Sequence, residues 1–198
     1  MKNIKKEILT LILLLLPIAI TIMAMFILPD TIPIHFNANG EITRFGSKYE
    51  NFINLIAFIS VGILLKLYSN HLRKTIKSTT DYKIKIDSER NKNVVDYINI
   101  VILIIFNIIN IYLLLIQYYY SINSYTSFEF DTYKFISIII SILIIIIGNI
   151  IPKSKPNSFI GIRTFWSVKN DLSWSYSQRY GGVTLILCGI FIIVGSFF

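Results

Sequence analysis

Apolar residues are gathered into five long runs, which polar stretches separate. The runs fall at about 8–28, 51–68, 94–120, 134–151 and 181–198. A helix of about 20 apolar residues crosses roughly 30 Å of hydrocarbon, and each run comes close to that length or exceeds it. The pattern therefore predicts an all-α integral membrane protein, a bundle of about five transmembrane helices.

The polar stretch after the first run, residues 28–48, has a shorter period. Ile32, Ile34 and Phe36 occupy alternate positions, and Asn39–Gly40 offers a tight turn before a second short alternation. A period of two around an Asn-Gly pair predicts a small β-hairpin. We expect this hairpin loop on the external membrane surface, directly after the first helix.

His35 lies in the predicted hairpin, with Asp30 and Glu41 nearby. The usual spacing of zinc ligands is absent, and no cysteine accompanies this histidine. We therefore expect no metal and no cofactor, and a structural or ligand-contacting role for His35.

Polar side chains within the third run share one face of the predicted helix. They are Asp96, Asn99, Asn107, Asn110 and Gln117. At 100° per residue they fall within an arc of roughly 80°. One interpretation is hydrogen bonding between helices, which holds them together in lipid. The other is a polar pathway or a ligand groove. We expect this helix at the centre of the bundle.

The fourth and fifth runs carry small residues at helical spacing. These are Ser137, Ser141 and Gly148 in the fourth run, and Gly182, Gly189 and Ser196 in the fifth. Faces of small residues let helices approach closely in membranes, so we expect tight packing along both faces.

Composition and charge agree with a membrane protein and suggest its orientation. Hydrophobic residues make up 54% of the chain and charged residues only 15%, against roughly 25% charged in soluble domains. Of the 19 lysines and arginines, only Arg44, Lys48 and Lys134 fall on one side of the predicted membrane. The positive-inside rule then places the N-terminus in the cytoplasm and the C-terminus outside.

The formal charge of +8 is expected to attract anionic lipid headgroups. There is no compact basic domain, so we expect no direct binding of nucleic acid.

The chain divides into three predicted parts. Residues 1–70 form a two-helix unit with the external hairpin, 71–93 a basic cytoplasmic loop, and 94–198 a helical unit with the cytoplasmic loop "GIRTFW". In the basic loop, "DYKIKID" (residues 81–87) alternates like a short strand; no site is expected there.

Two segments resemble the signatures of a known family. "LPDTIPIHFNANGEITRFGSK" resembles the segment after the first helix of a bacterial membrane domain of unknown function. "GNIIPKSKPNSFIGIRTFWSVKNDLSWSYSQRYGG" resembles the signature of the SdpI family, immunity proteins against sporulation-delaying-protein toxins. The matching residues are Gly148, Asn149, Pro152, Lys153, Asn157, Gly161, Ile162, Arg163, Thr164, Trp166, Asn170, Trp174, Arg179 and Gly182. The chain departs from the family at Phe165, where proline is usual, and at Thr43, where aspartate is usual.

This resemblance implies a protein of the bacterial cytoplasmic membrane that protects the cell from a secreted, membrane-active toxin peptide. In the prototype system such a protein also signals by recruiting a transcriptional repressor to the membrane. The candidate residues for ligand or partner binding are His35, Phe36 and Asn37 in the hairpin, Asn107 and Asn110 in the third helix, and Asn157, Arg163, Thr164, Trp166, Trp174 and Arg179 near the C-terminal end. The hairpin would meet the peptide, while Arg163, Trp166 and Trp174 would lie at the cytoplasmic headgroup level.

Other functions stay open. The polar face of the third helix favours a transporter or exporter of a small amphiphilic or peptide substrate, although no ATP-binding motif and no evident inverted repeat accompany it. Catalytic motifs such as H-E-x-x-H and G-x-S-x-G are missing, so no enzyme is expected. Arg163 and the tryptophans could also be a structural staple, with Asp171 or Asp96 as the partner of the arginine.

Overall fold

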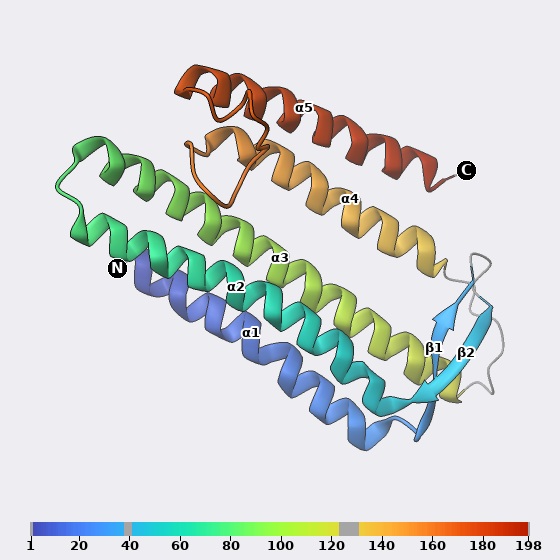
Figure 1. The fold of residues 1–198 in the computed structure, drawn as a ribbon. Helices are drawn as coiled ribbons and strands as arrows, with labels where there is room; N and C mark the ends of the chain where they lie inside the picture. The colour runs from blue at the N-terminus through green and yellow to red at the C-terminus, as the bar shows by residue number, and fades with distance from the viewer. Residues whose placement is uncertain (1, 38–40, 123–130, 198) are drawn as a thin grey trace. The chain divides into compact units, whose positions relative to one another are not determined.

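The computed structural model describes residues 2–37, 41–122 and 131–197 (Figure 1). Its elements are α1 (Lys2–Ile27), β1 (Thr31–Phe36), β2 (Ile42–Ser47), a 3₁₀ turn (Lys48–Glu50), α2 (Asn51–Ser78), α3 (Tyr82–Ile122), α4 (Thr132–Ile150), a second 3₁₀ turn (Ile151–Lys153) and α5 (Asp171–Gly195). Within the described residues, five helices are long and apolar enough to cross a membrane. The predicted multi-pass helical protein with a small hairpin after the first helix is confirmed.

The prediction of a loop over residues 71–93 is wrong, because most of this stretch is helical. Only residues 79–81 separate α2 from α3, and "DYKIKID" belongs to the start of α3 rather than to a strand. The Asp81 carboxylate accepts a 3.0 Å hydrogen bond from the backbone N–H of Ile84, which is the geometry of a helix N-cap. This cap and the opposite charges at helical spacing outweigh an alternation that covers only three apolar residues.

The hairpin forms where the period of two predicted it. β1 and β2 pair antiparallel, with Thr31 opposite Ser47 and irregular register around His35. Ile32 is fully buried in a small core. The predicted turn at Asn39–Gly40 lies outside the described residues.

The chain forms two compact units, and α2, α3 and α4 each contribute to both. The first unit contains Met1–Gly62 and Ile102–Ser137, and the second contains Ile63–Val101 and Ile138–Phe198.

In the first unit, the polar face of α3 is bonded to α1. The side-chain amide of Asn107 donates to the backbone oxygen of Leu13 at 3.0 Å, and that of Asn110 donates to the hydroxyl of Thr21 at 3.2 Å. Both asparagines are buried.

The same face of α3 is also bonded to α2. Asn51 and Gln117 exchange two amide hydrogen bonds, of 2.9 and 3.0 Å. Both side chains are buried. The interpretation of the polar face as interhelical hydrogen bonding is therefore confirmed for Asn107, Asn110 and Gln117, and these bonds explain why the three amides are tolerated in an apolar helix.

In the second unit, small residues bring α4 and α5 into close contact. A Cβ atom at Gly148 would lie 2.7 Å from the backbone oxygen of Gly182, and one at Gly189 would lie 2.9 Å from that of Ser141. Side chains larger than hydrogen would not fit at either glycine without movement of the backbone. The predicted close approach along these small-residue faces is confirmed for these positions.

Candidate functional site

Lys48 joins the hairpin to the end of α1. Its Nζ donates to the backbone oxygen of Leu28 at 3.2 Å and forms an ion pair with Asp30 at 3.0 Å, with only 13% of the lysine side chain exposed. The last carbonyls of a helix lack intrahelical partners and carry partial negative charge, so this ammonium satisfies one of them. Sequence reasoning missed Lys48 as a structural residue, although it ends the segment that carried the resemblance.

The polar side chains of the hairpin bond to one another. His35 Nδ1 lies 2.9 Å from Thr43 Oγ1 across the two strands. The Asn37 amide donates to the Glu41 carboxylate at 2.6 Å and accepts from the Glu41 backbone N–H at 2.9 Å. His35 and Asn37 therefore stabilise the hairpin while lying at its surface. Within the described residues, no three His, Cys, Asp or Glu side chains come together as a metal site.

Phe36 attaches the hairpin to the helices of the first unit. Its ring centroid lies 5.4 Å from that of Tyr120, which is buried. Its backbone oxygen accepts a 3.2 Å hydrogen bond from the Tyr133 hydroxyl at the start of α4. Of the three hairpin candidates, Phe36 thus contacts the helices, whereas His35 is exposed.

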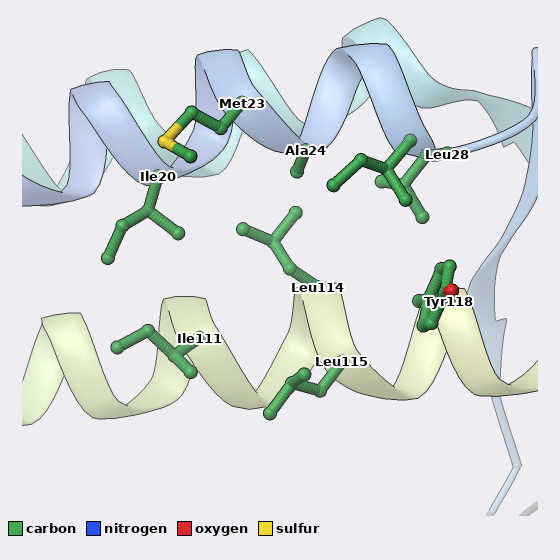
Figure 2. A pocket seen from close by; sticks show the side chains of 9 residues that line it. Ile20, Met23, Ala24, Leu28, Ile111, Leu114, Leu115 and Tyr118 are labelled. Atoms are coloured by element: carbon green, nitrogen blue, oxygen red, sulfur yellow. The ribbon is translucent and has the colours of Figure 1, made fainter.

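An apolar groove runs between α1 and α3 next to the hairpin, and we call it the hairpin groove (Figure 2). It encloses about 390 Å³. Its lining consists of Ile20, Met23, Ala24, Ile27, Leu28, Ile111, Leu114, Leu115 and Tyr118. Leu28 and Leu114 also pack against Ile32 of β1, so the groove and the hairpin share one small core.

The hairpin groove differs from the polar groove that the third helix suggested. Asn107 and Asn110 do not line it, and their side chains are 5% and 3% exposed because α1 covers them. The Tyr118 hydroxyl is the one oxygen among the lining side chains. A ligand of this groove would therefore need an apolar surface.

The second candidate region lies in the second unit, and we call residues 154–170 the connecting segment, since they join the turn after α4 to α5. Asn157 organises its first half. The side-chain oxygen of Asn157 accepts from the backbone N–H groups of Phe159 and Ile160, at 2.8 and 2.6 Å, and its amide donates to the Lys155 and Ile160 oxygens. The Tyr68 ring of α2 packs against Phe159, with centroids 4.6 Å apart.

Gln178 of α5 holds the middle of the connecting segment. Its amide accepts from the Ile162 backbone N–H at 2.8 Å and donates to the Ile162 oxygen at 2.9 Å. The preceding Gly161 has a φ of 116°, which favours glycine, and a Cβ there would lie 2.7 Å from Gln178 Oε1. Sequence reasoning missed Gln178, although it follows Trp174 by one helical turn on the same face of α5.

The two tryptophans lie in opposite environments. Trp174 is 1% exposed, and its indole N–H donates to the Ser154 oxygen at 3.1 Å. The Trp174 ring therefore packs inside the second unit and is not available to contact a lipid headgroup or a partner directly. Trp166 is 69% exposed, so of the two it alone presents its ring at the surface.

The second half of the connecting segment is a tight turn that ends in a helix cap. Thr164 and Ser167 exchange hydrogen bonds between their side chains and backbones, from 2.7 to 3.1 Å. The side-chain oxygen of Asn170 then accepts from the Ser173 backbone N–H at 2.8 Å and caps α5. Arg179 is exposed on α5, away from these bonds.

Arg163 donates to the Ser158 backbone oxygen at 2.6 Å. Both carboxylates that the sequence suggested as partners of Arg163 pair with lysines instead. Asp171 forms an ion pair with Lys83 at 2.7 Å, and Asp96 forms one with Lys92 at 2.5 Å. The predicted staple from Arg163 to Asp171 or Asp96 is therefore wrong. The polar contacts that hold the segment come from Asn157, Gln178 and Trp174 instead, and the guanidinium of Arg163 lies at the surface.

Two ranges of the chain match models of known protein families. The model of the SdpI/YfhL protein family matches residues 153–198, and that of a domain of unknown function (DUF1648) matches residues 12–59. The chain is also 29% identical over 194 residues to the Immunity protein SdpI of Bacillus subtilis (strain 168), covering 98% of this chain and 83% of that protein. The chain is thus similar to the SdpI/YfhL family over residues 153–198 and to an immunity protein over nearly its whole length. No solved structure gives a significant match.

The two matched ranges overlap the two candidate regions, although the α3 residues that line the hairpin groove lie outside both ranges. Residues 12–59 include most of α1, the hairpin and the start of α2, while the SdpI/YfhL match spans the connecting segment and α5. Each matched range thus includes one segment outside the long helices, the hairpin in the DUF1648 match and the connecting segment in the SdpI/YfhL match.

Proposed function

We propose that this chain is a membrane immunity protein that protects the cell producing it against a membrane-active toxin peptide. The observation that carries the proposal is the similarity to the Immunity protein SdpI, because it extends over 98% of the chain and includes all five apolar helices. A match of that extent favours a shared role more than a motif match alone would.

The proposed orientation puts the hairpin outside the cell and the connecting segment inside. The distribution of lysine and arginine supports it, with Arg44, Lys48 and Lys134 alone on the outer side. The hairpin groove is lined by the last residues of α1 and by the C-terminal part of α3. In this orientation the groove opens in the outer half of the bilayer, where a secreted peptide first enters.

We infer that an apolar segment of the peptide docks in the hairpin groove from the lipid. Apolar contact with lipid is as favourable as apolar contact with leucine, so recognition in this place must come from close packing and from hydrogen bonds. The shape of the groove would supply the packing. His35 and Asn37 at the hairpin surface, together with the Tyr118 hydroxyl, would supply polar contacts at the headgroup level.

The polar face of α3 suggested a transport pathway. Its side-chain amides at Asn107, Asn110 and Gln117 instead form hydrogen bonds to α1 and α2. No observation in the described residues now favours transport over immunity. Recruitment of a transcriptional repressor stays a prediction that rests on the family resemblance. In the proposed orientation, the connecting segment is the cytoplasmic surface that such a repressor would bind.

Survival of a sensitive strain tests the proposal. Cells expressing this chain are challenged with purified sporulation-delaying-protein toxin and with peptides secreted by the strain that carries the gene. We expect protection by the wild-type chain. Death at the same peptide concentrations as the empty-vector strain, with the protein present in the membrane, would refute the immunity role.

A matched pair of variants then tests the groove. Ala24→Leu adds bulk to the groove wall, whereas Ala19→Leu makes the same change at an exposed position of α1 outside the groove. We expect Ala24→Leu to reduce protection and Ala19→Leu to leave it unchanged, at equal amounts of membrane protein. Equal protection by both variants would exclude the groove while leaving the immunity role intact.

A further inference from the structure

The connecting segment ends in an exposed group of apolar side chains. Phe165 is 81% exposed, Trp166 69% and Val168 49%. The two rings pack edge to face, with centroids 5.7 Å apart and an interplanar angle of 82°. Large apolar side chains that gather at a protein surface mark a site of interaction with a membrane or a partner.

Two cations flank these rings. The Lys169 ammonium lies 5.8 Å from the centroid of the Trp166 ring, and Arg163 uses one of its five donors on the Ser158 oxygen. Asp171, the acidic residue closest in sequence, is already paired with Lys83. The surface formed by Arg163, Phe165, Trp166, Val168 and Lys169, which we call the aromatic tip, therefore combines exposed rings with net positive charge.

The backbone beneath the aromatic tip is held in place. Gln178 fixes Ile162 on one side of it, the Thr164–Ser167 turn lies within it, and Asn170 caps α5 on the other side. A surface that is already ordered loses less conformational entropy when it binds. The tip is thus preorganised rather than a loop that must fold on a partner.

The position of the aromatic tip in the chain indicates which partner it meets. It lies in the connection between α4 and α5, and each of these helices is long and apolar enough to cross a membrane. Hydrogen bonds from Trp174 and Gln178 to Ser154 and Ile162 hold this connection against the first turns of α5, so it cannot extend far from the end of that helix. Tryptophan beside lysine and arginine is typical of the lipid–water interface, and anionic headgroups attract basic residues next to a membrane span.

We propose that the aromatic tip binds the headgroup layer of anionic phospholipid, with Phe165, Trp166 and Val168 inserted below the phosphates that Arg163 and Lys169 contact. This contact would set the depth of the α4–α5 connection in the bilayer. It is independent of toxin binding, which we assign to the hairpin groove of the other unit.

The fluorescence of Trp166 tests the insertion. The chain has two tryptophans, so the difference between wild type and Trp166→Phe, which keeps buried Trp174, reports Trp166 alone. The protein is reconstituted in phosphatidylcholine bilayers in which either phosphatidylcholine or added phosphatidylglycerol carries bromine near the headgroup end of its chains. We expect brominated lipid to quench Trp166 and aqueous iodide to leave it largely unquenched. Quenching by iodide and not by lipid would overturn the proposal and favour a protein partner.

The charge of the aromatic tip is tested in the same bilayers. The ratio of quenching by brominated phosphatidylglycerol to quenching by brominated phosphatidylcholine measures the preference for anionic lipid. Arg163→Gln and Lys169→Gln are each expected to lower this preference by up to about fivefold, given the usual contribution of one cation near an anionic surface. Lys77→Gln, an exposed lysine of α2 outside the tip, should leave the preference unchanged. Equal quenching by the two lipids in the wild type would overturn the anionic-lipid assignment.

Discussion

The two units hold their helices together by different means. In the first unit, side-chain amides of α3 bond to α1 and α2, as Asn110 does with Thr21 and Gln117 with Asn51. In the second unit, α4 and α5 touch through glycines, and the packing of Gly148 against Gly182 leaves no space for a Cβ. Lipid supplies no hydrophobic force between helices, so hydrogen bonds and close packing are the two available solutions.

The surfaces that the two units present also differ. The first unit carries an apolar groove beside a hairpin whose polar side chains bond to one another. The second presents exposed rings and cations on a segment fixed by buried polar contacts. This contrast teaches that a polar stretch in a membrane protein can be structural in its buried part and available for binding in its exposed part, as Trp174 and Trp166 show.

The largest loss of stability is expected from a substitution at a glycine where α4 and α5 are in contact. Gly182→Ala would place a Cβ 2.5 Å from the backbone oxygen of Gly148, and overpacking of this kind costs about 1–3 kcal/mol. The fraction of folded protein, followed as the proportion of SDS in mixed micelles rises, measures this loss. Gly195→Ala is the matched control, because nothing lies within 4 Å of its Cβ position. Equal stability of the two variants would contradict the close-packing account of the second unit.

The next largest effect concerns the support of the connecting segment. Gln178→Ala removes two hydrogen bonds to the backbone of Ile162. The variant leaves the backbone N–H and oxygen of Ile162 without these partners. A buried polar group without a partner costs about 1–3 kcal/mol. Since both groups are partly buried, we expect the free energy of unfolding in the same SDS titration to fall by about 2 kcal/mol in total. Arg179→Ala, at the exposed neighbouring position, should change stability little. A Gln178→Ala protein as stable as Arg179→Ala would show that the segment is held by other contacts.

The smallest effect is expected between α2 and α3 of the first unit. A double-mutant cycle with Asn51→Ala and Gln117→Ala measures the coupling of their reciprocal hydrogen bonds. Such pairs in membrane proteins contribute about 0.6 kcal/mol on average and up to roughly 1.7. The two single variants and the double variant are compared in the same titration. A coupling of zero would mean that this amide pair does not hold the helices.

The sequence predicted those helices and strands that a local pattern of apolar residues determines by itself. Runs of about 20 apolar residues predicted the five helices, and the alternation from Ile32 to Phe36 predicted the hairpin. The extension of α2 and α3 into residues 71–93 escaped prediction because the stretch is charged, and the Asp81 side chain that caps α3 is a single local signal within it. Charge alone does not distinguish a solvated loop from a solvated helix.

The candidate sites were less predictable, because they depend on how helices face one another. The polar face of α3 was evident, but the choice between bonding to a neighbour and lining a groove needed the position of Leu13 and Thr21 on α1. Likewise, nothing local separates Trp174 from Trp166, since only the fold buries one and exposes the other. The hairpin groove itself arises from two helices far apart in sequence.

Site-directed photo-cross-linking tests the central claim, that a toxin peptide docks in the hairpin groove, most directly. A photoreactive amino acid is placed at Leu115, which lines the groove, or at Ile104, an exposed position of α3 about 16 Å away along the helix and outside the groove. After illumination of cells exposed to the peptide, the account predicts a covalent adduct from position 115 and none from position 104. Adducts of equal yield at both positions, or at 104 alone, would contradict it.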